Sequence, residues 1–333
     1  MDEKFNAGVI GYPVDHSLSP KIHNAVYQGL GIPWRYGKFS ARTSEDVAEV
    51  VGRAREICSA GEGGFIGFNV TTPHKILASQ LSDRANPSAY IVGGANVMTF
   101  SNSDGKLVVS CDTTDGEGAC RALENSGAPI EGSRVLICGT GAAALSIMVS
   151  AMMRGARTVR VATRSPERAG RKISGILDRA QSASSAGMLE NWGFGEDRRP
   201  VSWKPCPASD VVVDYVTAVA SLGSFDIVVN GTPLGMNAGD GSPLEGAVFR
   251  EGQTVMDCVY AHGATKIVED ALSGGARVMD GLSMLVEQAL MTIAIWMESA
   301  GRPFSPGDPQ LYGLLRGAGI DVPNSGASDS GDA

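Results

Sequence analysis

The sequence predicts an α/β fold in two domains, the second of which contains a parallel sheet covered by helices. From residue 115 onward, short apolar runs alternate with helical patterns, as in sheets whose strands are joined by crossover helices. The first 114 residues alternate similarly but include Asn102-Ser-Asp-Gly105, a hairpin signature. A chain of 333 residues, 43% of them hydrophobic, is long enough for two cores.

The first domain is predicted to begin with a strand at 9–10 that ends at Gly11. A helix follows from a Ser19 cap, with Pro20 in its first turn, to residue 30. The remaining elements are a strand at 34–39, a helix at 43–58, a strand at 64–70, a helix opening at 72–73, and hairpin strands at 97–100 and 107–110.

The second domain is predicted to begin with a helix at 116–126. Its strands are expected at 134–138, 158–162, 226–230 and 254–258, and its helices at 142–154, 166–179 and 264–274. Residues 183–224 are rich in Ser, Gly, Trp and charge, which predicts an extended excursion between two strands of this domain.

The apolar helix predicted at 282–296 is expected to pack back on the first domain. The expected division is therefore a first domain of residues 1–114 plus 282–323 and a second domain of residues 115–281. The Ser/Gly/Asp-rich residues 324–333 are expected to form a disordered tail.

The composition argues against several classes of function. The net charge is −8 and no basic stripe is present, so nucleic-acid binding is not expected. No apolar run is long enough to span a membrane and the first residues carry no signal-peptide pattern, which predicts a cytoplasmic protein. The four histidines do not cluster and the six cysteines form no C-x-x-C pair, so neither a metal site nor disulfides are expected.

A glycine-rich motif follows the strand predicted at 134–138. It reads G-x-G-x-x-A, with Gly139 for the tight turn, Gly141 for close approach of backbone to a pyrophosphate, and Ala144 for helix–strand packing. Ala142 opens the following helix, whose N-terminus faces the phosphates. The second domain is therefore predicted to be a Rossmann-type dinucleotide-binding domain.

The end of the next strand indicates which dinucleotide binds. An NAD site usually has an acidic residue there, for the ribose 2′-hydroxyl. This chain instead offers two guanidinium groups and two hydroxyls, which suit the 2′-phosphate of NADP: Thr163, Arg164, Ser165 and Arg168.

Three polar runs in and after the first domain fit one binding site. Residues 11–24 supply the hydroxyls of Ser17 and Ser19 on a Pro-bounded turn, and residues 67–75 supply an amide, a hydroxyl and Lys75. Residues 113–116 supply the carboxylate of Asp115. Hydroxyls and amides recognise a polyhydroxylated acid, and a Lys/Asp pair moves a proton. With the dinucleotide motif, this predicts redox chemistry on a small polyol acid.

On these residues the chain resembles the shikimate/quinate dehydrogenase family, and its shikimate branch most closely, from about residue 9 to residue 296. The matching runs are Ser17-Leu-Ser19-Pro, Asn69-Val-Thr71-x-Pro-x-Lys75, Gly93-Gly-Ala-Asn96, Thr114-Asp115-Gly116, Gly139-x-Gly141, Val229-Asn230-Gly-Thr232-Pro-Leu-Gly235-Met236, Asp257-x-Val-Tyr260 and Gly281-x-x-Met284-Leu-Val-x-Gln288.

The resemblance implies NADP-dependent interconversion of shikimate and 3-dehydroshikimate, a step toward chorismate and the aromatic amino acids. Lys75 would transfer the proton, with Asp115 beside it in an orienting role. The implied substrate-binding residues are Ser17 and Ser19 as the carboxylate clamp, Tyr260 closing that side, and Thr71, Asn96 and Gln288 at the ring hydroxyls; Asn69 and Thr114 are also expected to bind substrate. The implied cofactor-binding residues, besides those named above, are Asn230, Thr232, Gly281 and Met284.

Some positions depart from the family pattern and leave alternatives open. Val97 stands in place of the usual Thr, Asp112-Thr113 in place of Asn, and residues 261–262 in place of Asn-Pro. A quinate or aminoshikimate dehydrogenase on the same scaffold is the first alternative, and a non-catalytic NADP-binding regulator is the second. Ser19 favours shikimate, since relatives that handle quinate tend to have Thr there. A monomer or homodimer is expected.

Overall fold

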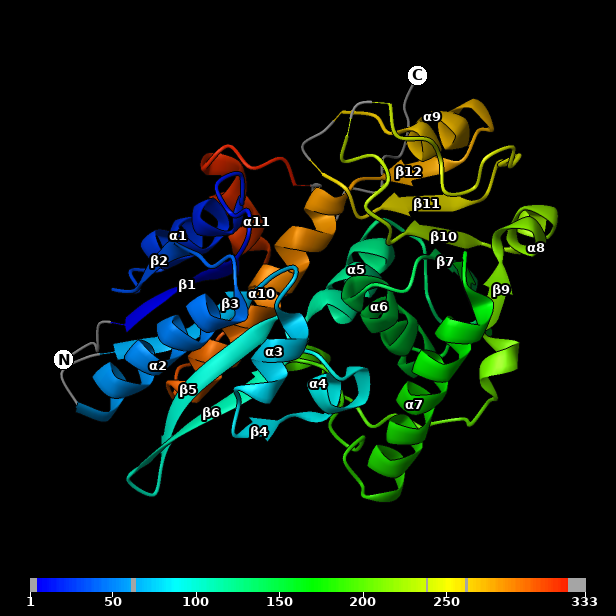
Figure 1. Cartoon of the computed structure of the whole chain (residues 1–333). Coiled ribbons are helices and arrows are strands. Elements are labelled where there is room, and N and C mark those ends of the chain that lie inside the picture. The colour runs from blue at the N-terminus through cyan, green and yellow to red at the C-terminus, as the bar shows by residue number, and fades with distance from the viewer. Residues whose placement is uncertain (1–4, 61–63, 238, 261–262, 323–333) are drawn as a thin grey trace.

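The structure is a computed structural model that describes residues 5–60, 64–237, 239–260 and 263–322. Two six-stranded sheets, each flanked by helices, form the two halves of the molecule (Figure 1). The predicted tail at 324–333 lies outside the described residues, and so do residues 261–262, which depart from the family pattern.

The first sheet is mixed and has the strand order β2-β1-β3-β5-β6-β4. Its strands are β1 (Phe5–Gly11), β2 (Arg35–Ser40), β3 (Gly64–Val70), β4 (Arg84–Ala85), β5 (Val97–Ser103) and β6 (Lys106–Asp112). β1 is parallel to both β2 and β3, whereas β5 is antiparallel to β3 and to β6. The β5–β6 turn places Asp104 at φ 53° and Gly105 at φ 76°, as a two-residue hairpin of this hand requires.

Helices cover both faces of this sheet, and the alternation of side chains along the strands supplies a core on each face. Val9 and Ile10, adjacent on β1, pack with opposite sets of helices. Ile66 and Phe68 of β3 also lie in different cores, because the pairing of β1 with β3 shifts register at Ile66. The helices of this half are α1 (Ser19–Gly29), α2 (Ser44–Ala60), α3 (Lys75–Gln80), α4 (Pro87–Val92), α10 (Gly281–Ser299) and α11 (Pro309–Gly317).

The second sheet is entirely parallel and has the order β12-β11-β10-β7-β8-β9. Its strands are β7 (Arg134–Cys138), β8 (Thr158–Thr163), β9 (Val212–Asp214), β10 (Ile227–Asn230), β11 (Thr254–Asp257) and β12 (Arg277–Met279). Read from the opposite edge, this is the 3-2-1-4-5-6 order of a Rossmann sheet. The order reverses between β7 and β10, so a crevice opens at their carboxyl ends.

Both faces of the second sheet are buried, as expected for a parallel sheet. Val135 and Ile137 of β7 face one helical layer, while Leu136 and Cys138 face the other. The surrounding helices are α5 (Asp115–Asn125), α6 (Ala142–Met153), α7 (Pro166–Ser185), α8 (Tyr215–Ala220) and α9 (Lys266–Ser273), with 3-10 turns at Gly195–Asp197, Ala208–Asp210 and Leu222–Ser224.

Helix α10 returns from the second sheet to the first, as predicted for 282–296. It packs against α5 and contacts β3 and β5 (Figure 1). Trp296 near its end is fully buried, and its indole Nε1 donates to the carbonyl of Met98 at 3.2 Å. Because α5 and α10 are the two helices that enter and leave the second half, they carry residues from both halves to one place.

Three local predictions are wrong. Leu18, not Ser19, caps α1, and the Ser17 hydroxyl accepts from the Ser19 N–H at 3.3 Å. Helix α3 begins only at Lys75, since residues 71–74 form a turn closed by the His74 N–H on the Thr71 carbonyl.

The excursion predicted at 183–224 is the third. It contains the last turn of α7, the edge strand β9 and helix α8. The three-residue strand is too short to give a periodic signal, so sequence patterns could not reveal it.

Among the described residues, no helix is both long and apolar enough to cross a bilayer.

Candidate active site

A cavity of about 240 Å³ lies where the carboxyl ends of β1 and β3 approach the start of α5 and α10. Its wall includes nine of the ten residues predicted to be catalytic or to bind substrate: Ser17, Ser19, Asn69, Thr71, Lys75, Asn96, Asp115, Tyr260 and Gln288. They come from segments up to 271 positions apart in the chain, and the fold brings them together. The described residues contain no group of His, Cys, Asp and Glu able to hold a metal ion.

Lys75 and Asp115 form an ion pair at the wall of this cavity. Each is the first residue of a helix, Lys75 of α3 and Asp115 of α5. Their side chains are only 15% and 8% exposed, so the pair is largely shielded from water. The partial positive charge at the N-terminus of α5 interacts favourably with the Asp115 carboxylate. The arrangement can hold a proton next to a bound hydroxyl.

Asn96 orients this pair from behind. Its Nδ2 donates to Asp115 Oδ1 and to Gln288 Oε1, both at 3.1 Å. Its Oδ1 accepts from the Thr114 N–H at 2.8 Å. Thr114 is fully buried and lies behind Asn96 rather than on the cavity wall. Thr114, predicted to bind substrate, therefore contacts Asn96 rather than the cavity.

Asn69 has partners in the protein on both sides of its amide. Its Oδ1 accepts from the Tyr36 hydroxyl at 2.8 Å, and its Nδ2 donates to Thr292 Oγ1 at 3.1 Å. Tyr36 stacks on His23 with ring centroids 4.0 Å apart. These supporting residues were missed as site residues, and the only signal available was the placing of His23 in the first polar run.

The other predicted substrate residues also lie on the cavity wall. Ser17, Ser19 and Thr71 lie there with Tyr260, which follows β11 in the second half. Burial raises the pKa of the Tyr260 phenol, so the hydroxyl stays protonated and can donate. Three aliphatic hydroxyls and a phenol on the wall of one cavity suit a carboxylate recognised by neutral donors.

A second cavity, of about 810 Å³, opens at the carboxyl ends of β7, β8 and β10. Gly139 has φ +100°, a conformation that favours glycine. A Cβ on Gly231 would come within 2.8 Å of the Ala144 Cβ, so the small third residue of the motif is needed for the loop after β10 to approach α6. The wall contains the backbone of Gly139 to Gly141, as a dinucleotide requires.

The predicted NADP cluster is only partly on this wall. Thr163 and Arg164 line the cavity. Ser165 donates its backbone N–H to Thr163 Oγ1 at 3.2 Å, and neither it nor Arg168, one turn into α7, is among the lining residues. Tyr215 and Val216 at the start of α8 also line the cavity, and they were missed because the strand before them was missed.

The remaining predicted cofactor residues have distinct places. Thr232 lines the larger cavity, whereas Asn230 is fully buried and holds the loop after β10 by donating to the carbonyl of Leu234 and to Asp257. Gly281 and Met284 line the smaller cavity instead, and so does Ala143 of the glycine-rich motif. The smaller cavity thus contacts the dinucleotide motif through α6.

The family departures have structural explanations. Asp112 accepts from Asn86 Nδ2 at 2.7 Å and from Ser88 Oγ at 3.1 Å, so it ties the end of β6 to α4. The Thr113 hydroxyl pairs with Ser146 of α6 at 3.3 Å. Val97 is fully buried in the core. None of the three lines the small cavity.

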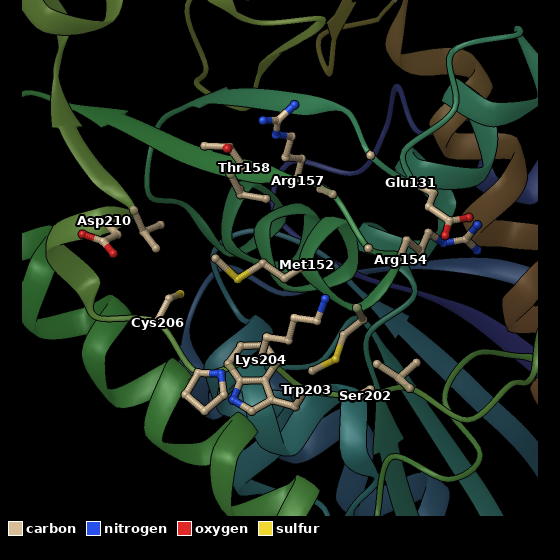
Figure 2. Close-up of a pocket in the computed structure, with 18 of the residues that line it drawn as sticks. Glu131, Met152, Arg154, Arg157, Thr158, Ser202, Trp203, Lys204, Cys206 and Asp210 are labelled. Atoms are coloured by element: carbon tan, nitrogen blue, oxygen red, sulfur yellow. The ribbon is translucent and has the colours of Figure 1, made fainter.

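A larger cavity, of about 1040 Å³, lies at the amino ends of the strands of the second sheet, beside the start of β8. Figure 2 shows Asp210 on one side of the view, Arg154 and Glu131 on the other, and Lys204 between them. Arg154 is already paired with Glu117 and Glu124. Because its polar groups do not converge, this cavity is a poor candidate for the active site despite its size.

Comparison with known proteins finds relatives in sequence and in structure. Residues 9–98 match the family model described as the shikimate dehydrogenase substrate binding domain. The chain is 35% identical to a shikimate dehydrogenase (NADP(+)) of Citrifermentans bemidjiense over 91% of this chain and 97% of that one. It is 33% identical to that of Geobacter metallireducens over 87% and 90%.

A solved structure, a shikimate dehydrogenase in complex with NADP⁺, superposes with a TM-score of 0.73. It is 24% identical and covers 96% of each chain, which supports the fold. The extent and the identity of the sequence matches show that this chain belongs to the shikimate dehydrogenase family.

Proposed function

We propose that this protein is an NADP-dependent dehydrogenase that interconverts shikimate and 3-dehydroshikimate. The observation that carries the proposal is the shielded Lys75–Asp115 pair on the wall of a small polar cavity that reaches the dinucleotide motif. The named relatives, at up to 35% identity over most of the chain, support the same activity.

The residues that line the 810 Å³ cavity at the glycine-rich motif fit the cofactor. A Cβ on Gly139 would lie 3.0 Å from Thr232 Cγ2 and a Cβ on Gly231 would lie 2.8 Å from Ala144 Cβ, so both positions need glycine for this close packing. Helix α6 begins directly after Gly141, which lines the cavity, and its N-terminus would favour a phosphate there. Arg164 would hold the 2′-phosphate, with Thr163 beside it. When bound, NADP supplies the hydride chemistry.

The protein's own part in the reaction is binding, orientation and proton transfer. Lys75 would accept the proton of the ring hydroxyl during oxidation and return it during reduction. Asp115 and Asn96 would fix the position of the amine. Ser17, Ser19 and Tyr260 would bind the carboxylate, and Thr71, Asn96 and Gln288 would bind ring hydroxyls.

The division into residues 1–114 plus 282–323 and residues 115–281 is part of the proposal. It is supported by the two sheets and by the cores on their faces. The cytoplasmic location, and the choice between monomer and homodimer, remain predictions. Cell fractionation and light scattering test them.

The activity is tested by a matrix of initial rates. Shikimate, quinate and aminoshikimate are each assayed with NADP and with NAD, and the Lys75→Ala variant serves as the blank for contaminating enzymes. The highest kcat/KM is expected for shikimate with NADP. A higher value on quinate or aminoshikimate would replace the proposed substrate. Tight NADP binding without turnover of any of them would favour a non-catalytic regulator.

A further inference from the structure

Lys172 links helix α7 to the glycine-rich loop, and neither the sequence motifs nor the comparisons assign it a role. Its Nζ donates to the carbonyl oxygen of Thr140 at 3.0 Å. Thr140 is the middle residue of Gly139-Thr-Gly141, and α7 begins six residues before Lys172. Since helical side chains tilt toward the N-terminus of their helix, Lys172 reaches back toward the cofactor cavity that Thr140 lines.

The bond to Thr140 has a consequence for the next N–H group. A trans peptide unit is planar, so the carbonyl of Thr140 and the N–H of Gly141 point in opposite directions. With the carbonyl held by Lys172 on the α7 side, the Gly141 N–H is turned away from α7. Gly141 lines the cofactor cavity, and its N–H has no partner among the backbone bonds of the described residues.

We propose that Lys172 is a positioning residue for the pyrophosphate of the cofactor: by holding the Thr140 carbonyl, it orients the 140–141 peptide so that its N–H can donate to phosphate oxygen. This inference rests on the proposed dinucleotide site. It assigns to Lys172 a role different from that of Arg164, which serves the 2′-phosphate and so distinguishes NADP from NAD.

The charge around Lys172 supports a role next to an anion. Burial, and then repulsion from Arg168 one turn earlier on α7, lower the pKa of Lys172. Two cations on neighbouring turns are unfavourable in an empty site and become favourable when phosphate binds nearby. Without a nearby anion, the repulsion between Lys172 and Arg168 would not be offset.

A rival role for Lys172 is direct contact with the 2′-phosphate, and cofactor fragments separate the two. ADP has the pyrophosphate but no 2′-phosphate, whereas adenosine 2′-monophosphate has the 2′-phosphate but no pyrophosphate. Binding of both fragments, and of NADP and NAD, is measured by isothermal titration calorimetry, which does not depend on turnover. The variants are Lys172→Met, which keeps the aliphatic stem, Lys172→Arg, and Arg171→Met as an exposed matched control.

Lys172→Met is expected to weaken ADP, NAD and NADP by one common factor of about three to ten, and to leave adenosine 2′-monophosphate unchanged. Lys172→Arg should restore most of the loss, and Arg171→Met should change none of the four by more than about twofold. Loss confined to NADP and adenosine 2′-monophosphate would overturn the proposal in favour of direct contact, and no loss at all would also overturn it.

Two further readouts protect the test. Lys172→Gln serves if the methionine variant does not fold, which its circular dichroism and melting temperature would show. If the wild-type protein binds neither ADP nor NADP, the dinucleotide site itself is wrong. That outcome is distinct from failure of the Lys172 assignment, in which wild type binds and the variant binds equally well.

Discussion

At the scale of single residues, side chains on the cavity wall are held by hydrogen bonds from other residues, some of which do not line the cavity. Thr114 holds Asn96, and Asn96 in turn holds Asp115 and Gln288. Tyr36 holds Asn69 in the same way. Such supports matter because a catalytic group must be placed within a fraction of an ångström to be effective.

The role of Lys75 is tested by Lys75→Ala. Because a positioned proton-transfer group contributes about 10² to 10⁴ in rate, kcat for shikimate oxidation should fall at least ~100-fold, with KM changed by no more than a few-fold. Lys106→Ala, at the start of the exposed hairpin strand, is the control for loss of a lysine. Near-normal turnover of Lys75→Ala in a steady-state assay would remove Lys75 from the mechanism.

The role of Arg164 is tested by Arg164→Ala. A hydrogen bond to a charged partner is worth about 1.5–3 kcal/mol, so NADP should bind roughly tenfold or more weakly. NAD, which lacks the 2′-phosphate, should be almost unaffected. Titration of both cofactors against the variant and wild type measures this, and equal weakening of the two would refute the assignment.

His23 should make the protein sensitive to acid. Burial lowers the pKa of His23 to about 3, whereas in the unfolded chain its pKa is near 6.5. Between these values the unfolded state binds a proton that the folded state does not. The free energy of unfolding should therefore fall as pH drops from 6.5 toward 3, by up to about 1.4 kcal/mol per pH unit from this group.

Urea unfolding of wild type and His23→Phe between pH 4 and pH 7 measures this contribution. Phenylalanine keeps a ring against Tyr36, so the comparison concerns the slope with pH rather than the absolute stability. The variant should lose stability less steeply on acidification. Identical slopes would mean that His23 can be protonated in the folded protein.

At the scale of elements, the packing of α10 against the first sheet requires a glycine at one position of β3. A Cβ on Gly67 of β3 would lie 2.2 Å from the Met98 carbonyl and 2.2 Å from the Trp296 indole nitrogen. Trp296 belongs to the helix that also carries Gln288 and Met284 into the small cavity. The packing of one glycine thus contributes to placing the site.

Gly67→Ala should accordingly destabilise the protein by at least about 2 kcal/mol, because neither the strand carbonyl nor the buried indole can move freely. Gly37→Ala on β2 is the matched control, since its nearest neighbour would be Phe39 at an ordinary contact distance of 3.8 Å. The control should change stability by less than about 1 kcal/mol. Equal denaturation midpoints for the two variants would contradict the packing argument.

The segment after α7 is a second example at this scale. Trp192 donates to Glu117 of α5 at 2.9 Å, and Arg198 makes two hydrogen bonds to Glu298 of α10. Asp197 pairs with Arg121 of α5. The segment predicted as an excursion therefore ties the second half of the molecule to both helices that connect it with the first.

At the scale of the whole molecule, the proposed function depends on two cavities, of which the small one is lined by residues of both halves and the cofactor cavity by residues of the second half. Ala143 lies on the wall of the small cavity although it belongs to the dinucleotide motif. Cys258 and Tyr260 reach that cavity from the end of β11. A substrate bound there would lie beside the end of the cofactor that reacts, as hydride transfer requires.

The same arrangement predicts a preference for shikimate over quinate. Quinate has a tetrahedral carbon next to its carboxylate, with one more hydroxyl, and the cavity wall has Ser19 rather than a threonine. A hydroxyl buried without a partner costs about 1–3 kcal/mol, so kcat/KM with NADP should favour shikimate at least ~10-fold. Equal or better efficiency on quinate in parallel assays would refute this preference.

The sequence alone determined the parallel sheet of the second half, its glycine-rich motif and nearly all polar residues on the wall of the small cavity. These follow from local patterns: apolar runs bounded by turn residues, and short motifs whose chemistry depends on a few adjacent positions. The boundaries of β3 and β7 agree with the prediction to the residue. The helix at 282–296 was also predicted to return to the first domain.

Only the tertiary structure decided which of those residues touch the cavities. Thr114 and Asn230 belong to matched motifs, yet both face protein partners. Gln288 accepts a hydrogen bond from Asn96, which lies 192 positions away in the chain. Lys172 of α7 donates to the carbonyl of Thr140 in the loop after β7. The physical reason is that a motif constrains the local backbone, whereas the direction of a side chain and its partner depend on how distant elements pack, and local periodicity carries no information about that.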